Sequence, residues 1–190
     1  MKKKALIILM LLISTSLFAQ NKETVNIPET NSKSMEFMSK DDSFIKKEFF
    51  DKGNIKGLKC QVLILTDINN QNKIGCLKLE TSCNASYGSP ANTFIGILDM
   101  DEINDCIKSL EYIKDNLLST SPSIYTEAEF KTRDNLKFGA YYNENKKKWK
   151  AYVYTKGSKS HSAEFFNSSN ISSLIDVMNN AKIEIEEKIK

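Results

Sequence analysis

Residues 93–117 read TFIGILDMDEINDCIKSLEYIKDNL, and this stretch joins a strand to an amphipathic helix. Thr93 to Leu98 is rich in β-branched and aromatic residues, which favour strands. Asp99 predicts the helix start, because Asp99 and Glu102 have the spacing of a capping box. Apolar residues then recur at intervals of three and four: Ile103, Cys106, Ile107, Leu110, Ile113 and Leu117. That period predicts a helix with one buried face.

A second helix repeats this pattern without a gap at an offset of 68 residues. Its apolar stripe is Ile171, Leu174, Ile175, Met178, Ala181 and Ile185. Either Asn167 or Ser169 is predicted to cap it, because Asn and Ser are favoured at helix N-termini.

Strand-forming segments precede each helix. In the first half, residues 58–66 and 73–80 flank the turn sequence DINNQN and predict a β-hairpin, followed by the strand at 93–98. In the second half, residues 124–132, 136–142, 149–154 and 162–166 have strand character. Residues 43–50 fit either a short helix or a first strand. The predicted fold class is therefore α+β, with antiparallel sheets each followed by an amphipathic helix.

The two halves form a predicted tandem repeat, with residues 58–120 as the first β-rich/α repeat and residues 121–190 as the second. Each half alone would bury little apolar area, so we expect the two to pack as one unit. The preceding residues 20–57 are predicted to be a polar flexible arm and lead-in, because residues 20–42 are polar, contain Pro28 and show no apolar period.

Residues 1–19 have the three-part plan of a secretory signal peptide. Three lysines precede the apolar run ALIILMLLI, and Ala19 is a small residue suited to cleavage. The run is shorter than the roughly 20 apolar residues that a membrane-spanning helix needs. We therefore expect an exported bacterial protein, periplasmic or extracellular, with no membrane span after signal removal.

Export changes how the charge is interpreted. The formal net charge of +3 comes from 27 basic and 24 acidic residues, and Lys2, Lys3 and Lys4 would leave with the signal. The mature chain would be close to neutral, which argues against a generally basic nucleic-acid or membrane binder.

All four cysteines, Cys60, Cys76, Cys83 and Cys106, lie after the predicted signal. An even number in an oxidising compartment makes disulfides plausible, with three connectivities open. Buried free thiols are the alternative. No Cys-x-x-Cys occurs, so the spacing does not predict a zinc site.

The order of elements over residues 58–189, several antiparallel strands and a helix, twice, resembles the Whirly and PUR-type single-stranded nucleic-acid-binding folds. This resemblance lies in element order and implies a fold. Fold likeness does not carry function, so single-stranded nucleic-acid binding is kept only as an alternative.

Candidate catalytic and metal-binding residues each have a simpler explanation. His161 is the only histidine and lies in the polar stretch SKSHS, which predicts an exposed loop residue. An acidic cluster comprises Asp99, Asp101, Glu102 and Asp105. It fails the calcium-loop pattern, because Ile103 occupies a ligand position, and acidic residues are favoured at helix N-termini. The sequence predicts no catalytic residue, no metal site and no cofactor.

The strongest surface feature is residues 131–159, where nine basic residues face only Asp134 and Glu144 among several aromatic residues. Strand alternation separates Trp149, Ala151 and Val153 from the side chains on the opposite face. The candidate binding face comprises Lys150, Tyr152, Tyr154, Lys156 and Arg133. A solvated sheet face is the simpler interpretation, since tyrosine favours strands.

These observations favour an exported non-enzymatic binding or interaction protein that uses this Tyr/Lys face, with an unknown protein or glycan of the cell envelope as partner. A hydrolase with dispersed catalytic residues is the alternative, since paired carboxylates need not be close in sequence. A further alternative is binding of single-stranded nucleic acid or glycan outside the cell.

Overall fold

The computed structural model describes residues 32–83, 92–157 and 162–190. The predicted signal peptide at residues 1–19 and His161 lie outside the described residues. Within them, no helix combines the length and apolar character needed to cross a lipid bilayer.

The chain forms two similar four-stranded antiparallel sheets, which confirms the predicted α+β class. Each sheet has its strands in sequence order. The first sheet comprises β1 (Ile45–Ile55), β2 (Leu58–Asp67), β3 (Lys73–Cys83) and β4 (Asn92–Asp99). The second comprises β5 (Glu127–Lys131), β6 (Lys137–Asn143), β7 (Lys148–Tyr154) and β8 (Ala163–Asn167).

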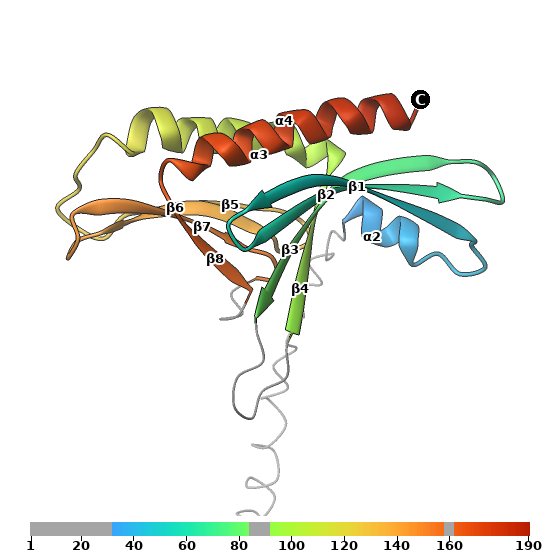
Figure 1. The fold of residues 1–190 in the computed structure, drawn as a ribbon, viewed down its shortest axis with the longest axis horizontal. Helices are drawn as coiled ribbons and strands as arrows, with labels where there is room; N and C mark the ends of the chain where they lie inside the picture. Colours follow the sequence, from blue (N-terminus) through green and yellow to red (C-terminus); the bar gives the residue numbers. More distant parts are fainter. Residues whose placement is uncertain (1–31, 84–91, 158–161) are drawn as a thin grey trace, which may run out of the picture.

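A long helix follows each sheet, and a short helix precedes the first. These are α3 (Met100–Tyr112), which continues into a π-helical turn η1 (Ile113–Leu117), then α4 (Asn170–Lys188) and the short α2 (Lys33–Met38). In Figure 1, α3 and α4 lie together on one side of both sheets, and α2 lies on the opposite side of the first sheet. We call the side away from α3 and α4 the outer face of each sheet.

Four details differ from the sequence-based predictions. Helix α2 lies within the predicted flexible arm and is ordered there because Phe37 is buried against the first sheet. The first sheet begins at Ile45, so part of the predicted lead-in is a strand, and the strand alternative for residues 43–50 is the one realised. The predicted capping box is wrong: Asp99 precedes α3 but makes no side-chain cap hydrogen bond there. Ser169 rather than Asn167 precedes α4, because Asn167 belongs to β8.

The apolar stripes of the two long helices are buried as predicted, except that Leu117 is only partly buried. They join side chains from both sheets in one hydrophobic core. Helix α4 crosses from the second half onto β1, β2 and β3 of the first sheet, while α3 contacts β3 and β4 as well as β5 and β6. The two halves therefore share a core and pack as one unit.

A glycine allows α4 to lie close to the first sheet. A Cβ atom on Gly75 of β3 would lie 2.5 Å from Cγ2 of Ile185 and 2.9 Å from Cδ1 of Ile64. Any side chain at this position would therefore push the helix and sheet apart.

The two sheets also meet directly, where β4 approaches the end of β7. A Cβ atom on Gly96 would lie 2.6 Å from the carbonyl oxygen of Thr155. The Thr155 hydroxyl hydrogen-bonds the Thr81 hydroxyl of β3 at 2.7 Å, and both side chains are buried. Ile97 of β4 donates its backbone N–H to Asp134 in the β5–β6 turn at 3.0 Å. These contacts place the outer faces of the two sheets next to each other.

The outer face of the first sheet is partly covered by α2. Phe37 of this helix packs with Leu63, Leu65, Cys76 and Ile97 in a second, smaller hydrophobic cluster. Among the described elements, no helix lies on the outer face of the second sheet. The two similar sheet units thus differ in what covers them.

The close contact between Gly75 and Ile185 gives a stability prediction. We expect Gly75→Ala to lower the free energy of unfolding by about 1–3 kcal/mol, because the added methyl overpacks the helix–sheet contact. Ile185→Ala should cost about 2–5 kcal/mol through the cavity it leaves. The double variant should lose less than the sum in urea unfolding, because the new methyl occupies that cavity.

A matched control comes from Ile183, which is on the same helix but 56% exposed. The effects of Gly75→Ala and Ile183→Ala should add to within about 0.5 kcal/mol. Additive effects of Gly75→Ala and Ile185→Ala would contradict the crossing of α4 over β3.

Candidate binding surface

The strand alternation predicted for β7 is confirmed. Trp149, Ala151 and Val153 are buried in the main core, between the sheet and the long helices. Lys150, Tyr152 and Tyr154 point to the outer face. Across the sheet, Lys150 is paired with Tyr141 of β6, and Tyr152 is paired with Phe165 of β8.

Five aromatic rings gather on this outer face: Tyr125, Tyr141, Tyr152, Tyr154 and Phe165, which we call the aromatic face. The ring centroids of Tyr125 and Tyr141 lie 6.3 Å apart and stack, while those of Tyr154 and Phe165 lie 6.1 Å apart edge to face. Both arrangements are favourable for aromatic pairs. Tyr125 is 57% exposed and Phe165 is 47% exposed, so flat ring surface remains open to solvent.

Tyr152 lies at the centre of the aromatic face but is only 2% exposed. It lies across Gly139 of β6, where a Cβ atom would be 2.6 Å from the tyrosine hydroxyl oxygen. The missing side chain lets the Tyr152 hydroxyl reach β5, where it lies 2.5 Å from Oε1 of Glu127 and 2.9 Å from Oε2 of Glu129. Tyr152 therefore supports the neighbouring rings from below and offers little surface to a ligand.

Hydrogen bonds extend from these two carboxylates to the edges of the face. Tyr125 donates its hydroxyl to Glu127 Oε2 at 2.8 Å, and the Lys137 ammonium lies 2.9 Å from Glu129 Oε1. Burial, followed by the contacts with Glu127 and Glu129, raises the pKa of Tyr152 well above its usual value. The hydrogen bond to Glu127 is the main cause that raises the pKa of Tyr125 to about 12.

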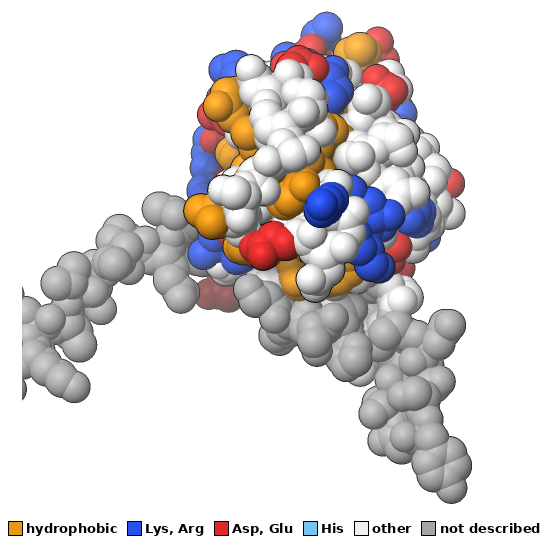
Figure 2. Space-filling view, turned by 90° about the vertical axis from the view of Figure 1, so that its left-hand side faces the viewer, with side chains coloured by type: hydrophobic (Ala, Val, Ile, Leu, Met, Phe, Trp, Pro, Cys, Tyr) orange, Lys and Arg blue, Asp and Glu red, His pale blue; other side chains and the backbone are white. Residues whose placement is uncertain are grey.

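Lysines gather at one end of the aromatic face. Lys150 donates to the side-chain oxygen of Asn167 at 3.2 Å. Its pKa is lowered by partial loss of solvent and then by the positive charges of Lys148, Lys146 and Lys56. Figure 2 looks onto the end of the molecule with the β6–β7 turn, where basic side chains gather beside apolar ones. Four lysines are therefore close enough at this end of the face for their charges to act on one another.

The structure places Arg133 away from Lys150, in a cluster with the acidic start of α3. Its guanidinium lies 3.1 Å from Asp99, 2.5 Å from Asp101 and 3.5 Å from Glu102. Arg133 therefore ties the second half to the first, and its own side chain is only 23% exposed. These ion pairs, together with the contacts to α2, account for most of the acidic cluster.

Asp99 also holds the N-terminus of α2. Its carboxylate, 2% exposed, accepts hydrogen bonds from the backbone N–H groups of Lys33 and Ser34 at 2.7 and 3.1 Å. The Ser32 hydroxyl donates to the same carboxylate at 3.0 Å. Asp99 thus occupies the N-cap position of α3, but its side chain binds the N-terminus of α2, whose own N-cap residue is Ser32. This is the physical reason why the predicted capping box is wrong.

Lys156 lies at the border between the two sheets. Its ammonium pairs with Asp134 at 3.4 Å, and both residues line a groove on the outer face of the first sheet. Of the five predicted binding residues, Lys150 and Tyr154 remain at an accessible part of the second sheet.

Three cysteines, Cys60, Cys76 and Cys106, are free and buried. Burial raises the pKa of Cys60 and of Cys76 to about 12, and that of Cys106 well above its usual value. They form no disulfide in the structure, and the free-thiol alternative describes them. The side chain of Cys83 lies outside the described residues.

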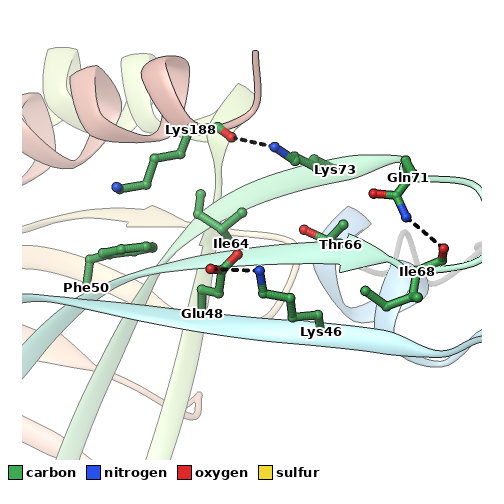
Figure 3. A pocket seen from close by; sticks show the side chains of 9 residues that line it. All are labelled: Lys46, Glu48, Phe50, Ile64, Thr66, Ile68, Gln71, Lys73 and Lys188. Carbon is green, nitrogen blue, oxygen red and sulfur yellow. Dashed lines mark hydrogen bonds and ion pairs between the residues drawn. The ribbon is translucent and has the colours of Figure 1, made fainter.

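One other cavity offers less for binding or catalysis. A cavity of about 390 Å³ lies between β1, β2 and the end of α4 (Figure 3). Its lysines already have contacts: Lys46 pairs with Glu48 at 3.0 Å, and the Lys73 ammonium donates to the Lys188 carbonyl at 3.4 Å. Among residues 32–83, 92–157 and 162–190, no three His, Cys, Asp or Glu side chains are placed to hold a metal ion.

Comparison with protein-family models gives no match for this chain. Comparison with curated protein sequences also gives no match.

Sequence reasoning missed the role of the two exposed carboxylates on β5, beside the aromatic face. Glu127 and Glu129 alternate with Ala128 and Phe130, so their shared face was visible in the sequence. That they bind the Tyr152 hydroxyl was not visible in the sequence, because this contact depends on Gly139 lying opposite Tyr152 in the strand register.

The hydrogen bond between Tyr125 and Glu127 gives a prediction for alkaline titration. The difference in tyrosinate absorbance between the wild type and Tyr125→Phe should show one tyrosine with a pKa near 12. When both proteins also carry Glu127→Gln, the same comparison should give a Tyr125 pKa that is closer to the ordinary tyrosine value of about 10. The pKa of Tyr125 is higher in the folded protein than in the unfolded chain. The hydrogen bond to Glu127 therefore stabilises the fold below about pH 10, and this stabilisation is lost as the pH rises toward 12.

The exposed Glu144 in the β6–β7 turn supplies the control for this titration. Glu144→Gln should leave the Tyr125 pKa near 12. A Tyr125 pKa that Glu127→Gln does not change would show that the carboxylate is not its partner.

The position of Arg133 predicts a structural role. Arg133→Ala should lower the free energy of unfolding by about 2–4 kcal/mol, because it leaves the buried Asp99 carboxylate without its cationic partner. Lys131→Ala, at an exposed position two residues away, should change it by no more than about 0.5 kcal/mol. Equal effects of the two substitutions in chemical unfolding would refute the assignment of Arg133 to the interface between the halves.

Proposed function

We propose that this chain is an exported, non-enzymatic binding protein that holds a glycan against the aromatic face. The observation that carries the proposal is the exposure of Tyr125 and Phe165 on a sheet face that no described helix covers. The corresponding face of the first sheet carries α2 instead. Exposed aromatic clusters of this kind are more typical of interaction sites than of solvated surface.

The chemistry of the face suits a sugar. A sugar ring presents a flat C–H surface that can stack on an aromatic ring, and its hydroxyls need hydrogen-bonding groups at the edge. The face provides rings at Tyr154 and Phe165 and, around them, the amide of Asn167 and the ammonium of Lys150. A few polar groups beside a mainly apolar contact area are the usual arrangement for orienting a small ligand.

The interior of the face supports a preorganised site. Tyr152 is buried, and its hydroxyl is held by Glu127 and Glu129, so the rings packed on it have restricted freedom. A preordered surface loses less conformational entropy when a ligand binds. The predicted signal at residues 1–19 adds that the protein would meet glycans of the cell envelope.

Single-stranded nucleic acid is a second candidate ligand, favoured by the lysines near Lys150. Aromatic rings beside a basic region can stack bases and attract phosphates. Glu127 and Glu129 weigh against this ligand, because they place negative charge on the same face.

The carboxylate pair favours one enzymatic alternative, a glycoside hydrolase. Retaining enzymes use two carboxyl groups about 5–5.5 Å apart, and Glu127 and Glu129 both reach one hydroxyl. On this hypothesis Glu129→Gln would abolish release of reducing sugar from an oligosaccharide. The proposed binding protein releases none.

Binding is tested with a panel of soluble envelope oligosaccharides by titration calorimetry. We expect Tyr154→Ala and Phe165→Ala each to weaken binding about tenfold or more, the loss of one aromatic contact. Tyr112→Ala is the matched control, because Tyr112 is 59% exposed but lies on α3.

Three results would contradict the proposal. One is an affinity that Tyr154→Ala and Phe165→Ala leave unchanged. Another is failure of the whole oligosaccharide panel to bind while single-stranded oligonucleotides bind in a salt-dependent way. The third is release of reducing sugar from an oligosaccharide that Glu129→Gln abolishes.

A further inference from the structure

A separate groove of about 460 Å³ crosses the outer face of the first sheet beside α2. Its apolar lining comes from Met35, Met38, Phe49, Leu63, Phe94, Ile95 and Ile97. Leu63 and Ile97 form a buried floor, whereas Met35, Phe49 and Ile95 are 40%, 50% and 42% exposed. The groove therefore has an apolar interior that is open to solvent.

Basic residues stand around this apolar lining. Lys47, Lys78 and Lys156 contribute to the wall, and Asp134 is the acidic residue among the lining side chains. The Lys78 ammonium lies 5.5 Å from the Phe49 ring centroid and pairs with Glu80 at 2.7 Å, and Lys156 pairs with Asp134 at 3.4 Å. Lys47 is exposed on the edge strand β1 beside Phe49. The wall thus combines apolar surface with a net positive charge.

The groove has walls on several sides. Helix α2 stands over part of the sheet, β1 provides Lys47 and Phe49 at one edge, and the Asp134–Lys156 pair stands beyond β4 at the other. Its volume is within the range of about 300–1,000 Å³ that small-molecule sites occupy. A small ligand fits these limits better than an extended protein surface does.

We propose that this groove binds an amphipathic anion, a carboxylate with a linear apolar tail. The tail lies on Leu63, Ile95 and Ile97, and the carboxylate meets Lys47 at the edge of the sheet. The flexible side chains of Met35 and Met38 adapt to tails of different shape, as methionine side chains do at apolar binding surfaces.

This site is distinct from the aromatic face. None of Tyr125, Tyr141, Tyr152, Tyr154 or Phe165 lines the groove, and Lys156 at the border is paired with Asp134. A failure of glycan binding at the aromatic face would therefore leave the proposal for the groove unaffected, and the reverse also holds.

The test uses dodecanoate below its micelle concentration, with dodecanol as an uncharged ligand of equal chain length. Binding is followed by titration calorimetry and by NMR of the ligand. We expect Ile95→Gln and Phe49→Ser each to weaken dodecanoate binding about tenfold, because they remove apolar contact area. Both residues are partly exposed, so folding should be retained, which a circular dichroism spectrum checks.

The charge of the ligand is tested through Lys47. Dodecanoate should bind at least about fivefold more tightly than dodecanol, and Lys47→Gln should remove most of that preference. Ile183→Ser is the control, because Ile183 is exposed on α4, far from the groove lining. No binding of dodecanoate, binding that Ile95→Gln and Phe49→Ser leave unchanged, or equal affinity for dodecanol would each overturn the proposal.

Discussion

The crossing of α4 onto the first sheet is the constraint on which the rest of the structure depends. The apolar stripe of this helix lies over β1, β2 and β3, and Ile185 reaches Gly75 so closely that any side chain there would displace its neighbours. Because α3 and α4 both lie on one side of the two sheets (Figure 1), one shared core stabilises both halves. The same arrangement leaves the outer face of each sheet without a long helix, and these faces are where the two halves differ.

A small group of polar residues fixes how the halves and the N-terminal helix meet. Asp99 accepts two backbone N–H groups of α2 and pairs with Arg133 from the second half. Such a buried carboxylate is costly unless its partners are all in place, so α2, the start of α3 and the β5–β6 turn are coupled in one arrangement. Asp134, the next residue after Arg133, binds the β4 backbone and Lys156. The border of the groove is therefore built by the same turn that joins the halves.

Much of the fold could be predicted because it follows from local periodicity. The stripes Ile103 to Ile113 and Ile171 to Ile185 are buried as their spacing indicates, and Trp149, Ala151 and Val153 face the core. Contacts between distant segments could not be predicted in this way. Asp99 occupies the N-cap position of the helix that follows it, but its side chain binds the N-terminus of a helix that begins 66 residues earlier in the chain. Strand alternation predicts that the Tyr152 ring is exposed on the outer face. The ring is buried instead, because Gly139 on the neighbouring strand has no side chain and leaves room for it.

The buried position of Tyr152 changes which residues of the candidate face can act on a ligand. A ring that is 2% exposed contributes by holding its neighbours, while Tyr154 and Phe165 present the contact surface. The carboxylates of Glu127 and Glu129 are needed for that support, since they bind the Tyr152 hydroxyl from β5. The same two charges oppose a phosphate-rich ligand and are compatible with the hydroxyls of a sugar. The carboxylates beside the rings on β5, rather than the rings alone, are therefore what favours the proposed glycan over a nucleic acid on this face.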